Sequence, residues 1–384
     1  MSRRRTVPSL DLGAAGAAFG LGGGGSRFLF AVPPLPEHVA PTVAVGAELT
    51  RRGHTVAWTG PAEAIGPLLG RGARLYPAGD GEPARRIAAP GDRRTPWRDA
   101  LVSFAHAALP DVEAAIDGFR PHVVIADRRA LAAPVAARRR GVRWAASTPS
   151  PPEEEPEELE RILDFQRACG EAEPADPTRS AELVLVFSTP ELADDPVRAR
   201  PGRLAFVGPM PERPQGGAFP WEWLDGARPA IVVSPGADDG GRLCRAAAEA
   251  VAGLTVQAVL VAPPDALPDP PPNALVRRRV PRGRLLPRMA AVVCRGGHDV
   301  VCRALAHGLP VVAAPAPGDR RAIARRVAET GAGLAVPDEP AALREAIAAV
   351  LEDPAYRRAA RAVQRSIEAA GGAAEAADRL ERLL

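Results

Sequence analysis

The strongest constraint on the fold is a series of short apolar segments that alternate with helical segments between residues 285 and 336. The pattern predicts buried strands at 291–294 and 310–315, with a helix from about 298 to 307 between them. An Arg-rich helix and a third strand follow. Strands of four to six consecutive apolar residues are typical of parallel sheets that helices cover on both faces. This segment therefore predicts an α/β fold built from β-α-β units.

The junctions between these strands and helices predict an anion site. Arg295, Gly296 and Gly297 follow the first strand and lead into a helix that begins at His298. Free backbone N–H groups and the helix dipole favour an anion there, and glycines allow a phosphate to approach the backbone. The turn at 316–319 follows the next strand, so it should face the same crevice, where open α/β sheets bind ligands.

The first half of the chain predicts a second unit of the same kind. Helices are expected at 39–52, 99–119 and 157–169, and residues 79–98 are expected to form a polar loop. Right-handed crossovers should join the strands of this unit. The expected strands are 27–33, 55–59, 73–77, 122–126, 183–188 and 204–207.

Composition excludes several classes of function. All 49 basic residues are arginine, which excludes a Schiff-base lysine, a P-loop lysine and a lysine general base. The net charge of +3 and the 4% aromatic content give no support to nucleic-acid binding. No apolar run reaches the roughly 20 residues that a membrane span needs. Four cysteines without C-x-x-C spacing predict buried thiols in a reducing cytoplasm, not a zinc site or disulfides.

Four motifs carry a resemblance to a known family: GGH (296–298), RALAHGLPVVAAP (303–315), GDRRAIARRV (318–327) and GAGLAV (331–336). They are similar to the runs HHGGHGT, EALAHGVPVV, ADQxxNAxRV and GAG of the UDP-glycosyltransferase-like superfamily. The similarity is greatest to the antibiotic-tailoring members from actinomycetes. The resemblance covers nearly the whole chain after Arg27 and implies the GT-B fold, in which two Rossmann-like domains face a cleft.

The resemblance also implies a catalytic pair. The loop PPLPEHVAP (33–41) is similar to the family's GHVNP loop and puts His38 at the position of the general base. A histidine over the crevice suits proton transfer near neutral pH. The alternative is an exposed or helix-capping histidine. Asp127 corresponds to the family's aspartate that orients this base. Its alternative role is an N-cap for the helix expected at 131–140.

Part of the donor site is similar to the family pattern. Ser234-Pro235-Gly236 resembles the S-x-G turn, in which the serine and backbone N–H groups face the diphosphate. The glycines of GGH and the helix from His298 imply a further diphosphate contact. Asp319 stands where the family uses an acid on sugar hydroxyls.

Other donor positions depart from the pattern. Arg279 and Arg282 replace an aromatic residue and a glutamine that lie near the nucleobase of the donor in the family. Arg320 replaces the glutamine beside Asp319. Arg295 replaces a histidine that contacts the diphosphate, and Arg303 replaces an acid that binds ribose hydroxyls. A guanidinium can stack on a base and pair with phosphate. Asp299 and Val300, in place of Gly-Thr, remove a hydroxyl and add a negative charge.

These residues are consistent with two functions. The first is an inverting glycosyltransferase that moves a sugar from a dTDP- or UDP-sugar to a hydroxyl of a hydrophobic small molecule, such as a polyketide aglycone. No metal ion is expected, because no D-x-D pair lies on a donor loop. The second is a catalytically impaired GT-B paralogue that acts as a binding or auxiliary protein. A nucleotide-sugar epimerase of the same architecture is a third hypothesis. The sequence leaves open whether the protein forms a homodimer or requires a helper protein.

The family architecture implies a division of the chain. Residues 1–26 are expected to be a disordered extension or an over-assigned start, and 209–229 a linker rich in Pro, Gly and Trp. The acceptor domain is expected at 27–208 and the nucleotide-sugar domain at 230–370. A helix at 371–384 should pack back on the first domain, with an oligomerisation helix as the alternative.

Overall fold

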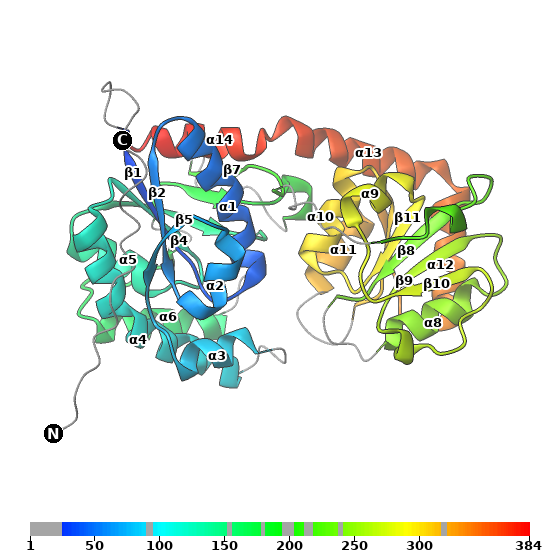
Figure 1. The fold of residues 1–384 in the computed structure, drawn as a ribbon, viewed down its shortest axis with the longest axis horizontal. Helices are drawn as coiled ribbons and strands as arrows, with labels where there is room; N and C mark the ends of the chain where they lie inside the picture. Colours follow the sequence, from blue (N-terminus) through cyan, green and yellow to red (C-terminus); the bar gives the residue numbers. More distant parts are fainter. Residues whose placement is uncertain are drawn as a thin grey trace.

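The computed structural model describes residues 25–89, 95–151, 156–177, 181–193, 203–210, 218–236, 241–315 and 321–384. The expected N-terminal extension lies outside these ranges apart from its last two residues. The described residues form two parallel sheets, each in its own lobe (Figure 1). The predicted α/β class is therefore confirmed.

The first sheet has seven strands within the described ranges, in the order β3-β2-β1-β4-β5-β6-β7. Successive residues of β1 point to opposite faces, so that Phe28 and Phe30 enter one apolar cluster and Leu29 and Ala31 the other. Both faces are buried, as the near-continuous apolar strands require. The strands are β1 (Arg27–Ala31), β2 (Thr55–Gly60), β3 (Arg74–Pro77), β4 (Val123–Asp127), β5 (Arg143–Thr148), β6 (Val184–Val186) and β7 (Leu204–Phe206).

Helices cover both faces of this sheet. Two of them, α1 (Pro36–Arg51) and α2 (Ala62–Leu69), lie on the face of Phe28 and Phe30. The opposite face packs against α3 (Glu82–Ala88), α4 (Thr95–Phe119), α5 (Ala132–Arg139) and α6 (Pro156–Ala168). Short 3-10 turns follow at η1 (Pro190–Leu192) and η3 (Trp221–Trp223).

Two local predictions for this lobe need correction. The segment 79–98 is not a continuous loop, because residues 82–88 form α3 and α4 already begins at Thr95. Ile87 of α3 is buried against α4, which stabilises a helix too short for a visible apolar period. Strand β5, with the sequence RWAAST, was not predicted, because its small buried residues lack the β-branched run of its neighbours.

The second sheet has six strands within the described ranges, in the order β10-β9-β8-β11-β12-β13. These are β8 (Ala230–Ser234), β9 (Gln257–Val261), β10 (Ala274–Arg277), β11 (Ala291–Cys294), β12 (Val311–Ala313) and β13 (Gly333–Ala335). One face carries α8 (Arg242–Val251) and α12 (Pro340–Glu352). The other carries α9 (Arg282–Leu285), η5 (Leu286–Arg288), α10 (His298–Ala306), α11 (Arg321–Glu329) and α13 (Pro354–Ala369). A short turn, η4 (Pro264–Ala266), follows β9.

The chain returns to the first lobe through its last helix. After α13, helix α14 (Gly372–Glu381) lies along α1 of the first lobe (Figure 1). Ala376, Ala377 and Leu380 are fully buried there, in the same cluster as Phe28 and Phe30. Residues 372–381 therefore complete the core of the domain that begins the chain.

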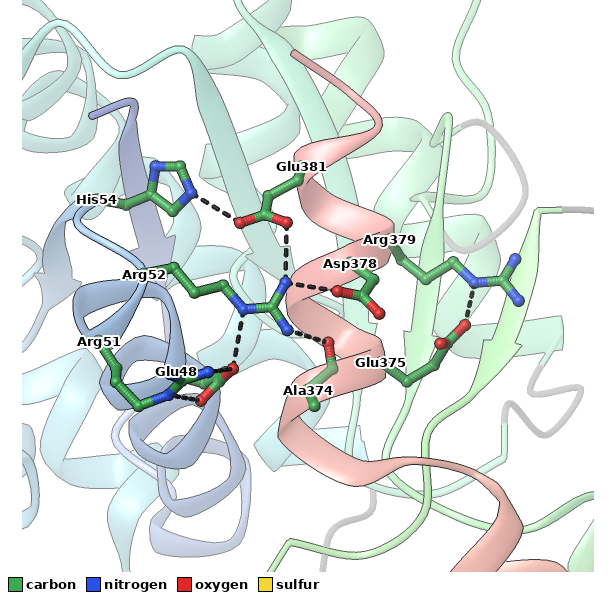
Figure 2. Close-up of polar contacts among 9 residues, drawn as sticks. All are labelled: Glu48, Arg51, Arg52, His54, Ala374, Glu375, Asp378, Arg379 and Glu381. Atoms are coloured by element: carbon green, nitrogen blue, oxygen red, sulfur yellow. Dashed lines mark hydrogen bonds and ion pairs between the residues drawn. The ribbon is translucent and has the colours of Figure 1, made fainter. Parts of the chain in front are cut away.

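An ionic cluster fixes α14 beside α1 (Figure 2). Arg52, at the end of α1, donates to Asp378 and Glu381 of α14 and to Glu48 of its own helix. Its guanidinium also donates to the carbonyl oxygen of Ala374 at 3.1 Å. His54 Nε2 lies 2.8 Å from the other oxygen of Glu381. The hydrogen bond to Asp378, followed by those to the two glutamates, raises the pKa of Arg52 against the effect of desolvation. Arg52 thus stays charged at every accessible pH.

We expect Arg52→Gln to lower the free energy of unfolding by about 1 kcal/mol, the upper end for partly exposed ion pairs. The variant loses bonds that join two segments far apart in sequence. Arg379→Gln is the matched control, because the ion-pair partner of Arg379 among the described residues is Glu375, within α14 itself (Figure 2). Thermal unfolding at low and high salt checks this, since salt should reduce the Arg52 effect. Equal shifts in both variants would contradict a joining role.

Candidate active site

The first half of the site is a histidine at the start of α1. Strand β1 ends at Ala31, and Pro36 occupies the first position of α1, where its fixed φ favours helix initiation. His38 therefore lies in the first turn, with its backbone N–H donating to the carbonyl oxygen of Leu35 at 3.0 Å. Its side chain is only 4% exposed. The turn directs the ring to the carboxyl edge of the first sheet.

Asp127 reaches the same edge from β4. Strands β1 and β4 are parallel neighbours with Ala31 opposite Ala126, so Asp127 lies just beyond the end of β1. His38 Nδ1 is 2.9 Å from each carboxylate oxygen of Asp127, which is 2% exposed. The backbone N–H of Arg129 also donates to Asp127 Oδ1. Helix α5 begins only at Ala132, so Asp127 does not cap it.

This pair has the geometry of an oriented base. A carboxylate can only accept a hydrogen bond, so Nδ1 must carry the ring proton and Nε2 the lone pair. Among the described residues none is hydrogen-bonded to Nε2. The structure therefore brings the two predicted catalytic residues together, with one ring nitrogen held and the other available to take a proton.

The second half of the site lies at the carboxyl edge of the other sheet. Strands β8 and β11 are parallel neighbours with Ser234 opposite Cys294. The turns after these strands, one through Gly236 and one through Gly296 and Gly297, therefore start side by side. Gly236 (φ 87°) and Gly296 (φ 76°) adopt the left-handed conformation that favours glycine. Helix α10 then begins with Gly297 as its N-cap and without a side-chain cap.

A hollow below these turns contains part of the predicted donor set. Its two charged lining residues, Arg282 and Arg303, lie near Ser234. Arg279 does not line the hollow and is exposed. The remaining lining residues are apolar: Val232, Val261, Val280, Leu285, Leu286, Val292 and Val300. An apolar hollow with a few polar groups is the usual form of a small-molecule site.

Asp299 and Arg303 both depart from the family pattern, and their opposite charges offset each other. Arg303 Nε donates to both carboxylate oxygens of Asp299, each at 2.9 Å, one helical turn away. The negative charge that Asp299 adds at the start of α10 is therefore balanced by the arginine that replaces the family's ribose-binding acid. The i, i+4 spacing of these residues is a signal that the sequence contains and that the prediction did not use.

The prediction that Arg295 contacts a phosphate directly is not supported by its placement. The guanidinium is 3% exposed and donates to Asp338 at 2.7 Å and to the carbonyl oxygen of Ala314 at 3.2 Å. Burial by itself would raise the pKa of Asp338, but Arg295 and then Arg242 outweigh it and hold the pKa below its usual value. Arg295 therefore fixes the loop after β11 from inside the protein.

His298 likewise contacts protein, and its contact crosses between the lobes. Its Nε2 lies 2.8 Å from Ser188 Oγ of the first domain and 3.2 Å from Cys302 Sγ. Desolvation lowers the pKa of His298 to about 4, in spite of the nearby Asp299. The ring is thus uncharged near neutral pH. Only the helix N-terminus at His298, not its side chain, offers positive potential to an anion.

Some predictions fall outside the described ranges. Asp319, Arg320 and the turn that holds them are not described by the structure and stay predictions. In the described ranges, no three His, Cys, Asp or Glu side chains come together as a metal-binding set. No helix in these ranges combines the length and apolar character that crossing a membrane requires. The four cysteines carry free thiols, and all but Cys169 are buried.

Two parallel sheets, an oriented imidazole at one carboxyl edge and a glycine-rich helix N-terminus at the other define a GT-B glycosyltransferase. Residues 242–383 match the family described as erythromycin biosynthesis protein CIII-like, C-terminal domain. The demethyllactenocin mycarosyltransferase of Streptomyces fradiae is 31% identical over 94% of this chain and 87% of its own length. The chain therefore belongs to the family of actinomycete natural-product glycosyltransferases and is an enzyme.

Two further comparisons agree with this assignment. The 4'-demethylrebeccamycin synthase of Lentzea aerocolonigenes is 27% identical over 94% of this chain and all of its own length. The solved structure of the kitacinnamycin glycosyltransferase has a TM-score of 0.81 at 25% identity, covering 94% of this chain and 99% of that one. The two-lobed architecture is therefore shared along nearly the whole chain.

We expect His298→Ala and Ser188→Ala to destabilise the protein non-additively, because each variant removes the same inter-lobe hydrogen bond. The coupling energy of a double-mutant cycle should be about 0.5–1.5 kcal/mol, the net value of a neutral hydrogen bond. Chemical denaturation of the two single variants and the double variant measures it. Strict additivity would show that the two side chains do not interact in solution.

Proposed function

We propose that this enzyme transfers a sugar from a dTDP- or UDP-sugar to a hydroxyl group of a hydrophobic small molecule, with inversion at the anomeric carbon. The observation that carries the proposal is the buried His38–Asp127 pair, in which both carboxylate oxygens lie 2.9 Å from Nδ1. Such a pair makes Nε2 a base directed at an incoming hydroxyl. The names of the relatives support a secondary-metabolite aglycone, such as a polyketide, as the acceptor.

In the proposed reaction His38 Nε2 takes the proton of the acceptor hydroxyl. The oxygen forms a bond to the anomeric carbon while the bond between that carbon and the diphosphate oxygen breaks. The attacking and leaving oxygens lie on opposite faces, which gives inversion. Asp127 keeps the imidazole in one tautomer and stabilises the imidazolium that forms. Because it is 2% exposed, little water screens this stabilisation.

The leaving nucleoside diphosphate gains negative charge, which the second sheet is proposed to bind. Backbone N–H groups near Gly236, Gly296 and Gly297 and the N-terminus of α10 supply positive potential without side-chain charge. Ser234 and Arg282 at the hollow add a polar and a cationic group. We propose that these groups meet the diphosphate charge without a metal ion. Contacts of Arg279, Asp319 and Arg320 with the nucleobase and the sugar of the donor remain predictions.

Calorimetric titration with dTDP and with UDP tests the donor half directly. Binding of one or both with a Kd below a millimolar supports the proposal. Absence of binding by both at millimolar concentration would favour a paralogue that binds without catalysis. Incubation with a sugar nucleotide alone distinguishes an epimerase from a transferase, because an epimerase would convert the sugar nucleotide without any acceptor. Transfer is then assayed with 4-methylumbelliferone, a flat phenol whose fluorescence changes on glycosylation.

We expect His38→Ala to lower kcat by about 10²–10⁴-fold, the usual contribution of a positioned general base. The Kd for dTDP or UDP should change less than about twofold, because the nucleotide site lies on the other sheet. His122→Ala is the matched control. His122 belongs to the same domain, is exposed, and accepts a backbone hydrogen bond from Arg27. Retention of most activity in His38→Ala would refute its assignment as the base.

A further inference from the structure

A second hollow lies at the carboxyl edge of the first sheet, where the ends of β1 and β2 meet helices α4 and α5. We call it the first-lobe hollow. Its walls are alanine, valine, phenylalanine and glycine, among them Ala31, Phe104 and Ala132, with one polar exception, Thr59. Thr59 is 1% exposed, and its Oγ1 has no hydrogen-bond partner among the described residues. The hollow thus contains one buried hydroxyl that the protein itself does not pair.

This hydroxyl has no evident use in the fold. A buried polar group without a partner destabilises a protein, and most such groups in folded proteins are paired. Valine has nearly the same shape as threonine and is equally suited to a strand, so it would fill the position without this penalty. The hydroxyl of Thr59 is accounted for when a bound molecule supplies its partner.

The walls of the first-lobe hollow indicate what that molecule is like. A buried water usually makes about three hydrogen bonds, but no other side chain of the hollow has a polar atom. The nearby backbone is already paired, because Val32 N–H donates to the carbonyl oxygen of Thr59 and Ala78 N–H to that of Gly60, each at 3.0 Å. The hollow therefore suits an apolar group that carries one oxygen atom better than it suits water.

The register of the sheet places Thr59 near the catalytic pair. Thr59 lies opposite Ala31 of β1, which lies opposite Ala126 of β4, the residue before Asp127. Neighbouring strands are about 4.8 Å apart, so the backbones of Thr59 and Ala126 are separated by roughly 10 Å. Asp127 points toward His38 of α1, whereas Thr59 points toward α4 and α5. A flat molecule that crosses the end of β1 therefore reaches both sides.

We propose that Thr59 is a specificity-determining residue that binds a second oxygen of the acceptor. The inference rests on the proposed function, because the same molecule presents its reacting hydroxyl to His38. The acceptor class is flat and mostly apolar, with the reacting hydroxyl at one end and a hydroxyl or carbonyl oxygen roughly 10 Å away. The threonine hydroxyl donates to a carbonyl and either donates to or accepts from a hydroxyl, so both kinds of oxygen fit.

Two phenols that differ in a single group test the proposal. 4,4'-Dihydroxybiphenyl has a hydroxyl at each end, and 4-phenylphenol lacks the far one. Transfer from dTDP- or UDP-glucose gives kcat/KM for each phenol in the wild type and in Thr59→Val. We expect the substitution to lower kcat/KM for 4,4'-dihydroxybiphenyl about 3–10-fold, the effect of one neutral hydrogen bond. The value for 4-phenylphenol should stay the same or rise, because valine makes the hollow more apolar.

The matched control is Thr55→Val, because Thr55 is exposed at the amino end of the same strand. It should leave kcat/KM for both phenols unchanged. Equal effects of Thr59→Val on the two phenols, or no effect on either, would overturn the proposal.

Thermal unfolding shows whether the hydroxyl serves the fold instead. Thr59→Val should keep or raise Tm, because it removes a buried polar group without a partner. Thr148→Val should lower Tm, since the buried hydroxyl of Thr148 donates to the carbonyl oxygen of Ser150 at 2.7 Å. A lower Tm in Thr59→Val, together with equal effects on the two phenols, would assign the hydroxyl to the fold and refute its role in specificity.

Failure of the proposed function would give a different result. If the wild-type protein transfers no sugar to 4-methylumbelliferone, the function fails. In that case, or if neither biphenyl accepts sugar, calorimetric titration compares the binding of the two biphenyls. We expect the wild type to bind 4,4'-dihydroxybiphenyl at least about threefold more tightly than 4-phenylphenol, and Thr59→Val to remove that preference. Absence of the preference in the wild type would overturn the role of Thr59 whether or not the protein is active.

Discussion

Parallel pairing of neighbouring strands is the constraint on which both halves of the site depend. In the first sheet, chain connections run in opposite directions on either side of the β1–β4 pair, and in the second sheet on either side of the β8–β11 pair. A crevice opens at the carboxyl end of such a pair, because the loops that leave the two strands diverge. His38 and Asp127 occupy the first crevice, and the glycine turns after β8 and β11 occupy the second. Under the proposed function, the two chemical tasks of the sugar transfer each use one switch point.

Arginine supplies the cation of a buried ion pair in each lobe, because the chain contains no lysine. Arg295 is buried against Asp338 and supports the phosphate-side turn, while Arg129 is buried against Glu158 and supports the base-side loop. In both, a guanidinium can satisfy several acceptors at once, which a single ammonium does less well. The loop conformations at the two crevices therefore depend on ion pairs from which water is largely excluded, and such pairs are costly to break by removing one partner.

The positions of the strands along the chain could be predicted well from the sequence, but the directions of the side chains could not. Local pattern predicted the strand ends at which His38, Asp127, Ser234 and the glycine turn lie. The roles of the three side chains came from the resemblance to the glycosyltransferase superfamily. The side chain of Arg295 was predicted to contact a phosphate, and the helix that begins at His298 was predicted to take up diphosphate charge. The side-chain partners of Arg295 and His298, which are Asp338 and Ser188, lie 43 and 110 residues away. No local pattern reports such pairings. Helix α3 escaped prediction because it is too short for a visible apolar period and is stabilised by Ile87 packing against α4.

The position of α14 has a consequence for how the protein is made. Ala376, Ala377 and Leu380 fill the core face of α1 and β1, although the first lobe's own strands leave the ribosome more than 150 residues earlier. During synthesis that apolar face must therefore remain uncovered until residues 372–381 emerge. The first lobe can collapse early, but it cannot reach its final packing before the second lobe has been translated. Nascent chains of this protein thus expose a hydrophobic surface that chaperones can bind throughout the synthesis of the second lobe.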